Sequence, residues 1–441
     1  MFQNDTKNSR FLSRRNAGFA NRGPRRGVKV RYHTLRYPLR FQATCEATAA
    51  FPPPVSAPDY ALRLHEQLPA PHAALRACVI IPAKDEAAAL PATLGALAAQ
   101  VDLAGRPLPP GSFEVIVLAN NCTDGTAAAV RHFARQHPAL AVHVARLRLA
   151  APDAHVGRAR RLLMDEACLR LLSLGRFNGI IASTDADTRV APDWLAATQA
   201  EIAAGADAVG GRILTDAPPL RPGEPAAPGA PSGVRRTQLR DAAYHLWCAR
   251  LEAQLDPQAA DPWPRHHQHF GASLALTARA YRRVGGLPVV RYLEDEALCQ
   301  QLRRYDLRLR HSPRVVVHTS ARQCGRVEVG LSWQLREWAA QGLAGGEPLV
   351  PCPQHLAALW HARRQLRAWW SHAAPFGVPG QGVAAALGLP EKQLARQVLA
   401  SCTFGRLWDW VAAARATAGV AVPQVPLSEA LAWLRAPGAG R

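Results

Sequence analysis

The feature that most constrains the fold of this chain is a regular alternation of apolar runs and helix-like segments between residues 77 and 184. The apolar runs have the length of buried strands and lie at 77–82, 113–119, 141–147 and 179–184. Between them the sequence predicts helices over about 86–100 and 157–173, and another that begins at 124–126. This order is typical of a mainly parallel sheet with helices on both faces. Ligands of such sheets bind beyond the carboxyl ends of the strands, so residues that follow these runs are the first candidates for a functional site.

Two carboxylates follow the last of these runs. Asp185 and Asp187 are separated by the small residue Ala186. Side chains at i and i+2 of an extended chain point to the same side, so both carboxylates can converge on one hard cation such as Mg²⁺ or Mn²⁺. A cation held there can also bind phosphate oxygens. Taken alone, the triplet is equally explained by a solvated loop at a strand end.

Charge and proline content suggest how the 441 residues are divided. The net charge is +20, and residues 1–50 hold eleven Lys or Arg against two acidic residues. We expect a basic, disordered extension with a Pro-rich linker over 1–75, a catalytic domain over 76–340 and a helical C-terminal region over 341–441. A dense run of Pro and Gly over 216–233 predicts a surface loop. Trp-rich apolar stripes in the last 100 residues predict a small helical core.

Composition also limits the location and the partners. The nine cysteines are scattered and predict reduced thiols in a cytoplasmic protein. No apolar stretch approaches the roughly 18 to 20 residues that a membrane span needs, although the positive charge is compatible with peripheral membrane contact. No basic strand interleaved with aromatic residues and no recognition helix stands out, so nucleic acid is not an expected partner.

Four short motifs stand in one order along the chain: Ile80–Glu86 (IIPAKDE), Asn120–Thr126 (NNCTDGT), Asp185–Asp187 (DAD) and Glu294–Glu296 (EDE). Together they resemble the family 2 glycosyltransferases of GT-A fold, over roughly residues 77–325. The resemblance implies an α/β fold of GT-A type and an enzyme that moves one sugar from a nucleotide-diphosphate sugar to a hydroxyl acceptor. The second motif departs from the family, because an amide, Asn120, stands where the family has a carboxylate. An amide both donates and accepts hydrogen bonds, so the preferred nucleobase stays open.

The resemblance also assigns residues on the donor side. Pro82 and Glu86 match positions that meet the nucleoside, and Asn120 begins the second donor motif. A charge in the first turn of a helix is the alternative explanation for Glu86. The stretch Gly157–Arg161 matches a basic segment near the diphosphate in relatives. We favour Arg158 as the phosphate contact because it follows the glycine, whereas a solvated helix face explains Arg160 equally well.

Metal ligands and a catalytic base are implied in the same way. Asp185 and Asp187 match carboxylates that hold Mg²⁺ or Mn²⁺ against the diphosphate, and Asp185 also meets the nucleotide sugar. His318, at the end of a short strand over 314–318, matches a third metal ligand; a strand-end imidazole bonded to backbone is the alternative. Arg322 is the neighbouring phosphate contact. Asp295 matches the base that deprotonates the attacking hydroxyl, with Glu294 beside it; a charged start to helix 294–304 is the alternative.

Other functions are less consistent with the sequence. The segment Trp333–Trp338 differs from the Gln-x-x-Arg-Trp signature of processive synthases, because Glu337 stands in place of the arginine. We therefore expect a non-processive enzyme. The resemblance implies an inverting reaction, although retaining relatives share the scaffold and the metal motif. A nucleotidyltransferase would need a glycine- and lysine-rich loop after the first strand, which residues 83–85 do not supply. A non-catalytic nucleotide-sugar-binding module would not need Asp185, Asp187 and Asp295 together.

Overall fold

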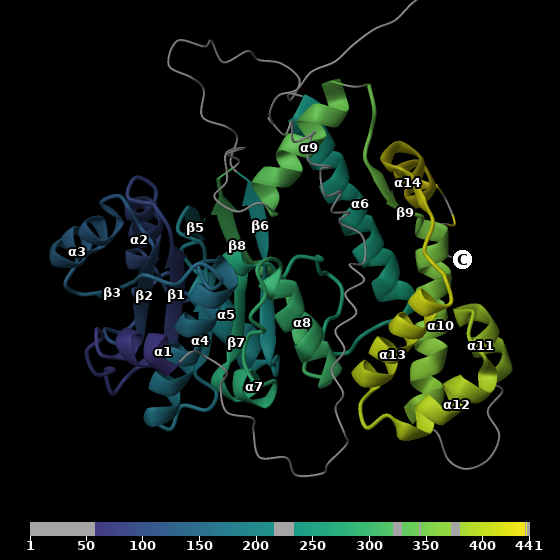
Figure 1. The fold of residues 1–441 in the computed structure, drawn as a ribbon, viewed down its shortest axis with the longest axis horizontal. Coiled ribbons are helices and arrows are strands. Elements are labelled where there is room, and N and C mark those ends of the chain that lie inside the picture. The colour runs from purple at the N-terminus through teal and green to yellow at the C-terminus, as the bar shows by residue number, and fades with distance from the viewer. Residues whose placement is uncertain are drawn as a thin grey trace, which may run out of the picture. The chain divides into compact units, whose positions relative to one another are not determined.

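The computed structural model describes residues 58–215, 233–320, 329–343, 345–371, 380–436 and 438, and its centre is an eight-stranded sheet of order β3-β2-β1-β4-β7-β6-β8-β5 (Figure 1). The strands are β1 (Ala77–Ala83), β2 (Phe113–Asn120), β3 (Ala141–Leu147), β4 (Ile180–Ser183), β5 (Thr188–Val190), β6 (Ala208–Thr215), β7 (Leu274–Thr277) and β8 (Leu309–Thr319). Strands β5 and β7 are antiparallel to their neighbours, and the other six strands point the same way. The sheet is therefore mainly parallel, as predicted.

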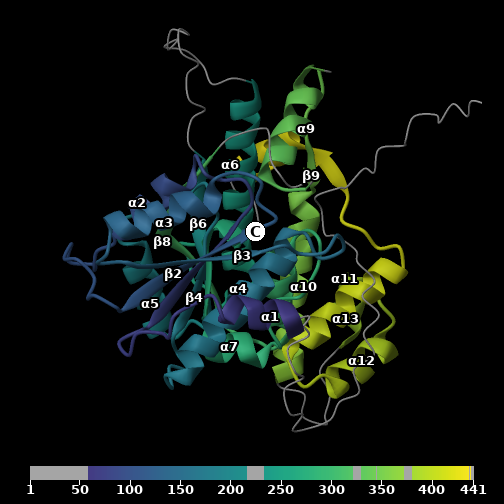
Figure 2. The ribbon, with the colours of Figure 1, turned by 60° about the vertical axis from the view of Figure 1, so that its left-hand side comes forward.

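Alternate residues of β1 contribute to hydrophobic cores on the two faces of the sheet. Cys78 and Ile80 pack on the face that carries α4 (Val156–Ser173), α7 (Ala278–Arg283) and α8 (Glu294–Arg304). Val79 and Ile81 pack on the face that carries α2 (Leu90–Ala98), α3 (Thr126–Gln136) and α5 (Trp194–Ala203). Figures 1 and 2 show these helices on the two sides of the strands. Because helices cover both faces of the sheet, β1 is a continuous run of apolar residues and does not alternate between apolar and polar ones.

The structure has a helix before residue 75, where we expected the folded part to start. Helix α1 (Pro58–His65) precedes β1, and its Leu64 is fully buried in the core beside α4, together with Leu75. The helix has only eight residues, which is too short for its apolar period to be recognised in the sequence. A second difference is that α2 begins at Leu90, with Pro91 in its first turn, rather than near residue 86.

The C-terminal region is helical, as predicted. It contains α9 (Leu331–Leu343), α10 (Pro353–Ser371), α11 (Gly380–Leu387), α12 (Glu391–Ala400), α13 (Phe404–Thr417) and α14 (Leu427–Arg435), and a two-stranded ribbon of β9 (Leu349–Pro351) and β10 (Gln424–Pro426) that we did not predict. Helix α9 runs through residue 340, where we placed the end of the catalytic domain. Trp360 is 9% exposed, and the other tryptophans we assigned to a core, Trp369, Trp370, Trp408 and Trp410, pack against buried residues of α10–α13.

The long helix α6 (Gly233–Leu255) follows β6 of the sheet in the sequence and packs against the C-terminal region. Its Tyr244, Cys248 and Leu251 form one core with residues of β9, α10 and α14. The start of α6 lies directly after the predicted loop, of which residues 216–232 fall outside the described part of the chain. Among the described helices, each is too short or too polar to cross a lipid bilayer.

Candidate active site

The predicted donor-side residues follow the carboxyl ends of neighbouring parallel strands. Ile80 of β1 pairs with Ser183 of β4, and Ala83 at the end of β1 pairs with Ala119 of β2. The segments that carry Glu86, Asn120 and Asp185 therefore leave the sheet at one edge, the position at which ligands bind in such folds. The side chains of Glu86 and Asn120 are buried, with 7% and 5% exposure, and Pro82 is half-buried.

Hydrogen bonds hold the Asp185–Asp187 turn against the segment that precedes β7. The Ser183 hydroxyl donates to the carbonyl of Gly271 at 3.0 Å, and the Thr184 hydroxyl donates to the carbonyl of Ala272 at 3.0 Å. From α2, the Thr93 hydroxyl donates to the carbonyl of Ala186 at 2.9 Å. The two aspartates keep 39% side-chain exposure at Asp185 and partial exposure at Asp187. A buried backbone thus presents two accessible carboxylates.

One buried arginine connects this turn to the acidic start of α8. Arg160, on α4, donates from Nη2 to Asp185 Oδ1 at 2.6 Å and from Nη1 to Glu294 Oε1. Its side chain is 4% exposed, so the solvated-face explanation for Arg160 is wrong. Arg158, which we favoured as the phosphate contact, pairs through Nε with Asp153 at 2.8 Å. Its role toward phosphate stays a prediction.

The neighbouring glycines make room for this basic stretch. A Cβ on Gly271 would lie 2.0 Å from Nη1 of Arg160, so a larger residue there would displace the guanidinium. The next arginine, Arg161, donates to the carbonyls of Gly285 and Leu287 at 3.1 and 2.8 Å. The basic stretch of α4 therefore positions the acceptor-side segment as well as the Asp185 turn.

Two carboxyl groups from the first turn of α8 lie at this junction. Asp295 Oδ2 accepts a hydrogen bond from the backbone N–H of Gly271 at 2.7 Å. Glu294 is 3% exposed, and burial raises its pKa to about 7, against the opposing charge of Arg160 and with a further upward contribution from Asp295. Three carboxylates, those of Asp185, Glu294 and Asp295, thus surround a single buried cation. A carboxyl that titrates near neutral pH in such a cluster is suited to acid–base chemistry.

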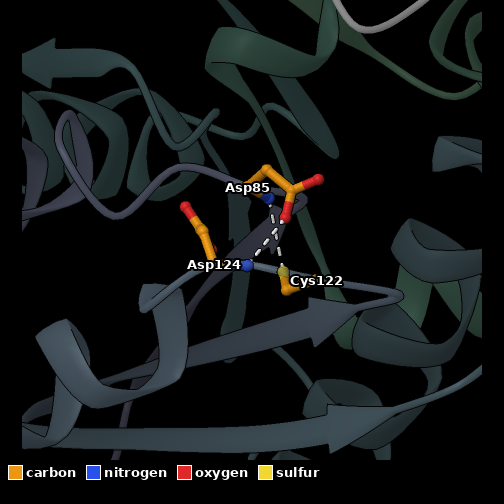
Figure 3. Close-up of side chains that lie close together, drawn as sticks. All are labelled: Asp85, Cys122 and Asp124. Atoms are coloured by element: carbon orange, nitrogen blue, oxygen red, sulfur yellow. Dashed lines mark hydrogen bonds between the residues drawn. The ribbon is translucent and has the colours of Figure 1, made fainter.

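Sequence reasoning missed a polar turn beside the expected nucleoside position (Figure 3). Asp85 has a left-handed backbone, with φ of 53°, and its Oδ1 accepts from the backbone N–H groups of Thr123 at 2.6 Å and Asp124 at 3.3 Å. These hydrogen bonds, the one from Thr123 first, lower the pKa of Asp85. The ligand atoms of Asp85, Cys122 and Asp124 lie within 4.8 Å of one another. Because backbone donors already occupy the Asp85 carboxylate, we interpret the group as a turn that joins the ends of β1 and β2.

The same loop resolves the alternative explanation for Glu86. Asp124 accepts from the backbone N–H of Thr126 at 2.9 Å, although the N-cap of α3 is Gly125, which has no side-chain capping hydrogen bond. The Thr126 hydroxyl accepts from the backbone N–H of Glu86 at 2.9 Å. Glu86 itself lies before α2, where its carbonyl accepts from the N–H of Leu90 at 3.0 Å. It is therefore not a charge within the first turn of that helix, and its contact with a nucleoside stays a prediction.

The predicted metal ligands share one region but do not form a closed group. His318 is exposed in β8 and pairs across the sheet with Arg189, two residues beyond Asp187. Within the described residues, Asp185, Asp187 and His318 are not among the sets of three potential ligands whose atoms all lie within 4.8 Å. Carboxylate oxygens at this edge still suit Mg²⁺ or Mn²⁺. The metal site stays a prediction, and Arg322 lies outside the described residues.

The sequence model of glycosyl transferase family 2 matches residues 78–240. This segment belongs to glycosyl transferase family 2. The match confirms the resemblance we inferred from the motifs, together with the GT-A type of α/β fold. It includes Glu86, Asn120 and the Asp185 turn of the family 2 segment, and it ends before Glu294, Asp295 and His318.

Several solved structures are similar to this chain at low identity. The mannosyltransferase PcManGT from Pyrobaculum calidifontis, in complex with GDP-Man and Mn²⁺, is 20% identical, with 81% of this chain and 93% of that chain covered and a TM-score of 0.38. S. aureus TarS 1-349 in complex with UDP-GlcNAc is 15% identical, with 78% and 92% covered and a TM-score of 0.39. Glucosyl-3-phosphoglycerate synthase from Mycobacterium tuberculosis, with Mn²⁺, UDP-glucose and phosphoglyceric acid, is 15% identical, with 62% and 81% covered and a TM-score of 0.34. No curated protein sequence matches the chain.

Proposed function

We propose that this family 2 protein is a metal-dependent transferase that moves a single sugar from a nucleotide-diphosphate sugar to a hydroxyl acceptor, in one inverting and non-processive step. The observation that carries the proposal is the bridge from Asp185 through Arg160 to Glu294, which joins the donor-side turn to the acidic start of α8. A donor bound at the first and a hydroxyl deprotonated at the second would lie on either side of one guanidinium group. Such proximity is a large part of what a transferase contributes.

The carboxylates at the strand edge fit a divalent cation. The carboxylates of Asp185 and Asp187 would hold Mg²⁺ or Mn²⁺, with His318 as the third ligand we propose. When bound, the cation would neutralise the negative charge that grows on the diphosphate as the sugar–oxygen bond breaks.

Asp295 is the residue we propose as general base. Its two oxygens accept from the backbone N–H groups of Gly271 at 2.7 Å and Glu296 at 2.8 Å, which fixes the orientation of the carboxylate. Glu294 faces Arg160 instead, so Asp295 is the member of the pair left to take the proton of the acceptor hydroxyl. That transfer lets the oxygen attack the anomeric carbon while the nucleoside diphosphate leaves.

A reducing compartment suits this enzyme. In the described part of the chain seven cysteines are free thiols, five of them buried. We propose a cytoplasmic location on this ground, where nucleotide sugars would be the donors and the acceptor an unidentified hydroxyl compound.

We predict that Asp295→Asn lowers the turnover by about 10² or more and leaves donor affinity unchanged, because the amide keeps the shape of the side chain but cannot accept the proton. The measurement is release of nucleoside diphosphate from a panel of nucleotide sugars in the presence of Mn²⁺, together with calorimetry of donor binding. Turnover by the variant at the wild-type rate would remove Asp295 from this role. Absence of any release by the wild-type protein over the whole panel would contradict the transferase proposal.

A further inference from the structure

A buried chain of hydrogen bonds runs from the first turn of α8 through two imidazoles. His269 Nε2 lies 2.5 Å from Glu296 Oε2, and His269 Nδ1 lies 3.1 Å from His311 Nε2. His311 Nδ1 lies 2.7 Å from Asp261 Oδ2. His269, His311 and Asp261 are at most 9% exposed, whereas the Glu296 side chain is 32% exposed, so the chain is buried except at its Glu296 end.

Both ends of this chain are ionised carboxylates. Glu296 Oε1 lies 3.4 Å from Nη1 of Arg303. The Asp261 oxygens lie 2.9 and 3.1 Å from Arg265 and Arg310. Cations other than the two imidazoles therefore favour the ionised form of both carboxyl groups. An ionised carboxylate can only accept hydrogen bonds. Nε2 of His269 and Nδ1 of His311 must therefore both carry a hydrogen.

The contact between the two rings then requires a third hydrogen. If both outer nitrogens donate and both rings are neutral, two lone pairs face each other at 3.1 Å between His269 and His311. That arrangement is repulsive, whereas one additional proton turns it into an N–H···N hydrogen bond. The pair therefore holds three ring protons and one positive charge between two negative carboxylates.

The extra proton can be assigned to one ring from the contacts. His269 Nε2 lies 2.5 Å from Glu296, against 2.7 Å from His311 Nδ1 to Asp261, and Asp261 already pairs with Arg265 and Arg310. His311 is then the neutral ring, which donates from Nδ1 to Asp261 and accepts at Nε2. His269 is the imidazolium and donates from both nitrogens.

We infer that protonated His269 is a positioning residue that fixes the first turn of α8. Glu296 is bonded to His269, and the preceding residue, Asp295, is bonded to the backbone N–H of Gly271, two residues after His269. One short segment, 269–271, thus anchors two consecutive residues of α8, one through a charged side chain and one through its backbone. The charge state concerns the protein alone, and only its effect on turnover rests on the proposed role of Asp295.

Other charged groups lie near this chain of hydrogen bonds, but none of them takes the place of His269 or His311 in it. Arg303 Nη1 lies 3.4 Å from Glu296 Oε1. Arg265 and Arg310 lie 2.9 and 3.1 Å from the Asp261 oxygens, and the ring of His266 stands edge-on to His311, with centroids 5.9 Å apart. The three arginines stabilise the ionised carboxylates and leave the donor positions of His269 and His311 unchanged.

The charge state can be measured directly on protein with ¹⁵N-labelled histidine at neutral pH. We expect ¹⁵N shifts of a doubly protonated ring for His269, shifts of a neutral ring with a proton on Nδ1 for His311, and a scalar coupling through the hydrogen bond between them. His269→Gln and His311→Gln assign the signals. Two neutral rings without a coupling would overturn the inference.

A second variant tests the dependence on Glu296. Glu296→Gln keeps a side chain of the same shape but removes the charge, so we expect His269 to lose its second ring proton at neutral pH. The control is Asp241→Asn, which removes a surface carboxylate 3.6 Å from His245 and should leave the His269 signals unchanged. An unchanged imidazolium in Glu296→Gln would contradict the inference.

The consequence for turnover is tested separately. We expect His269→Gln to lower kcat for sugar transfer by about 10-fold or more, with the donor Kd unchanged, because the base shifts and the donor pocket does not. Unchanged kcat would refute the positioning role. The NMR result stands even for a protein without transferase activity, so failure of the proposed function is distinguishable from failure of this inference.

Discussion

At the scale of single residues, the site depends on Arg160. This side chain is buried and pairs with Asp185 and Glu294, which belong to motifs that lie on either side of β6 and α6 in the chain. Removing one partner of a buried ion pair leaves a buried charge without compensation. Arg160 is therefore expected to matter for folding as well as for donor binding.

We predict that Arg160→Met lowers the free energy of unfolding by about 3–5 kcal/mol, because Glu294 loses its buried counter-ion. Chemical denaturation measures this change. The control is Arg106→Met, whose pair with Asp102 lies at the surface with 78% exposure of the arginine. We expect no resolvable change in that variant. Equal stability of Arg160→Met and wild type would show that the bridge contributes nothing.

The raised pKa of Glu294 predicts a pH dependence of stability. A carboxyl whose pKa rises from the usual 4.5 to about 7 on folding binds its proton more tightly in the folded state. Its contribution is therefore present below pH 4.5 and is lost as the pH rises toward 7. We predict that the free energy of unfolding of wild type, relative to Glu294→Gln, falls on the order of 3 kcal/mol between those two values. A relative stability that is flat with pH would contradict this assignment.

At the scale of elements, the sequence predicted the strands and helices that have a single strong pattern of apolar residues. The bounds of β3 and α8 agree with the sequence prediction, and those of β1, β2 and α4 agree to one residue. Strand β6 was not predicted because two glycines interrupt its apolar run. The structure explains both, since a Cβ on Gly210 would lie 2.5 Å from the carbonyl oxygen of Gln268 and one on Gly211 would lie 2.1 Å from the hydroxyl oxygen of Ser273. Such a close approach is a tertiary property with no local signal.

The candidate site was predictable to a similar extent. The apolar run before Asp185 predicted that Asp185 and Asp187 follow a strand, and they do follow β4 at its carboxyl end. The sequence favoured Arg158 over Arg160 because Arg158 directly follows Gly157, and it did not predict that Arg160 would be buried. Arg160 can be buried at this junction because Gly271, 111 residues further along the chain, has no side chain that would displace the guanidinium. A long-range contact of that kind leaves no trace in the spacing of the motif.

At the scale of the whole described molecule, α8 connects the candidate site with the C-terminal helices. Its first turn carries Glu294 and Asp295, and Asp306, just after its end, accepts from the backbone N–H groups of Phe404 and Gly405, both at 2.8 Å. These two residues begin α13. The C-terminal helices therefore support the end of the helix that carries the proposed base.

We predict that Gly405→Ala lowers the free energy of unfolding by about 1–3 kcal/mol, because the new methyl group would lie 1.8 Å from the carbonyl oxygen of Arg303 and force α13 away from α8. Denaturant melts measure the change. In the control Gly95→Ala, within α2, the added methyl group meets no atom within 4 Å. That variant is expected to be more stable by about 0.5–1 kcal/mol. A neutral Gly405→Ala would show that the docking of α13 tolerates displacement.

The most direct test of the whole account is the metal dependence of donor binding, measured by calorimetry with a panel of nucleoside diphosphates. We predict that the wild-type protein binds one of them with Mn²⁺ and loses most of that affinity in EDTA, and that Asp187→Ala binds weakly in both conditions. The control is Asp193→Ala, since this nearby carboxylate makes no capping hydrogen bond to α5 and should behave as wild type. Equal affinity with and without EDTA, or an Asp187→Ala variant that binds as tightly as wild type, would contradict the central claim.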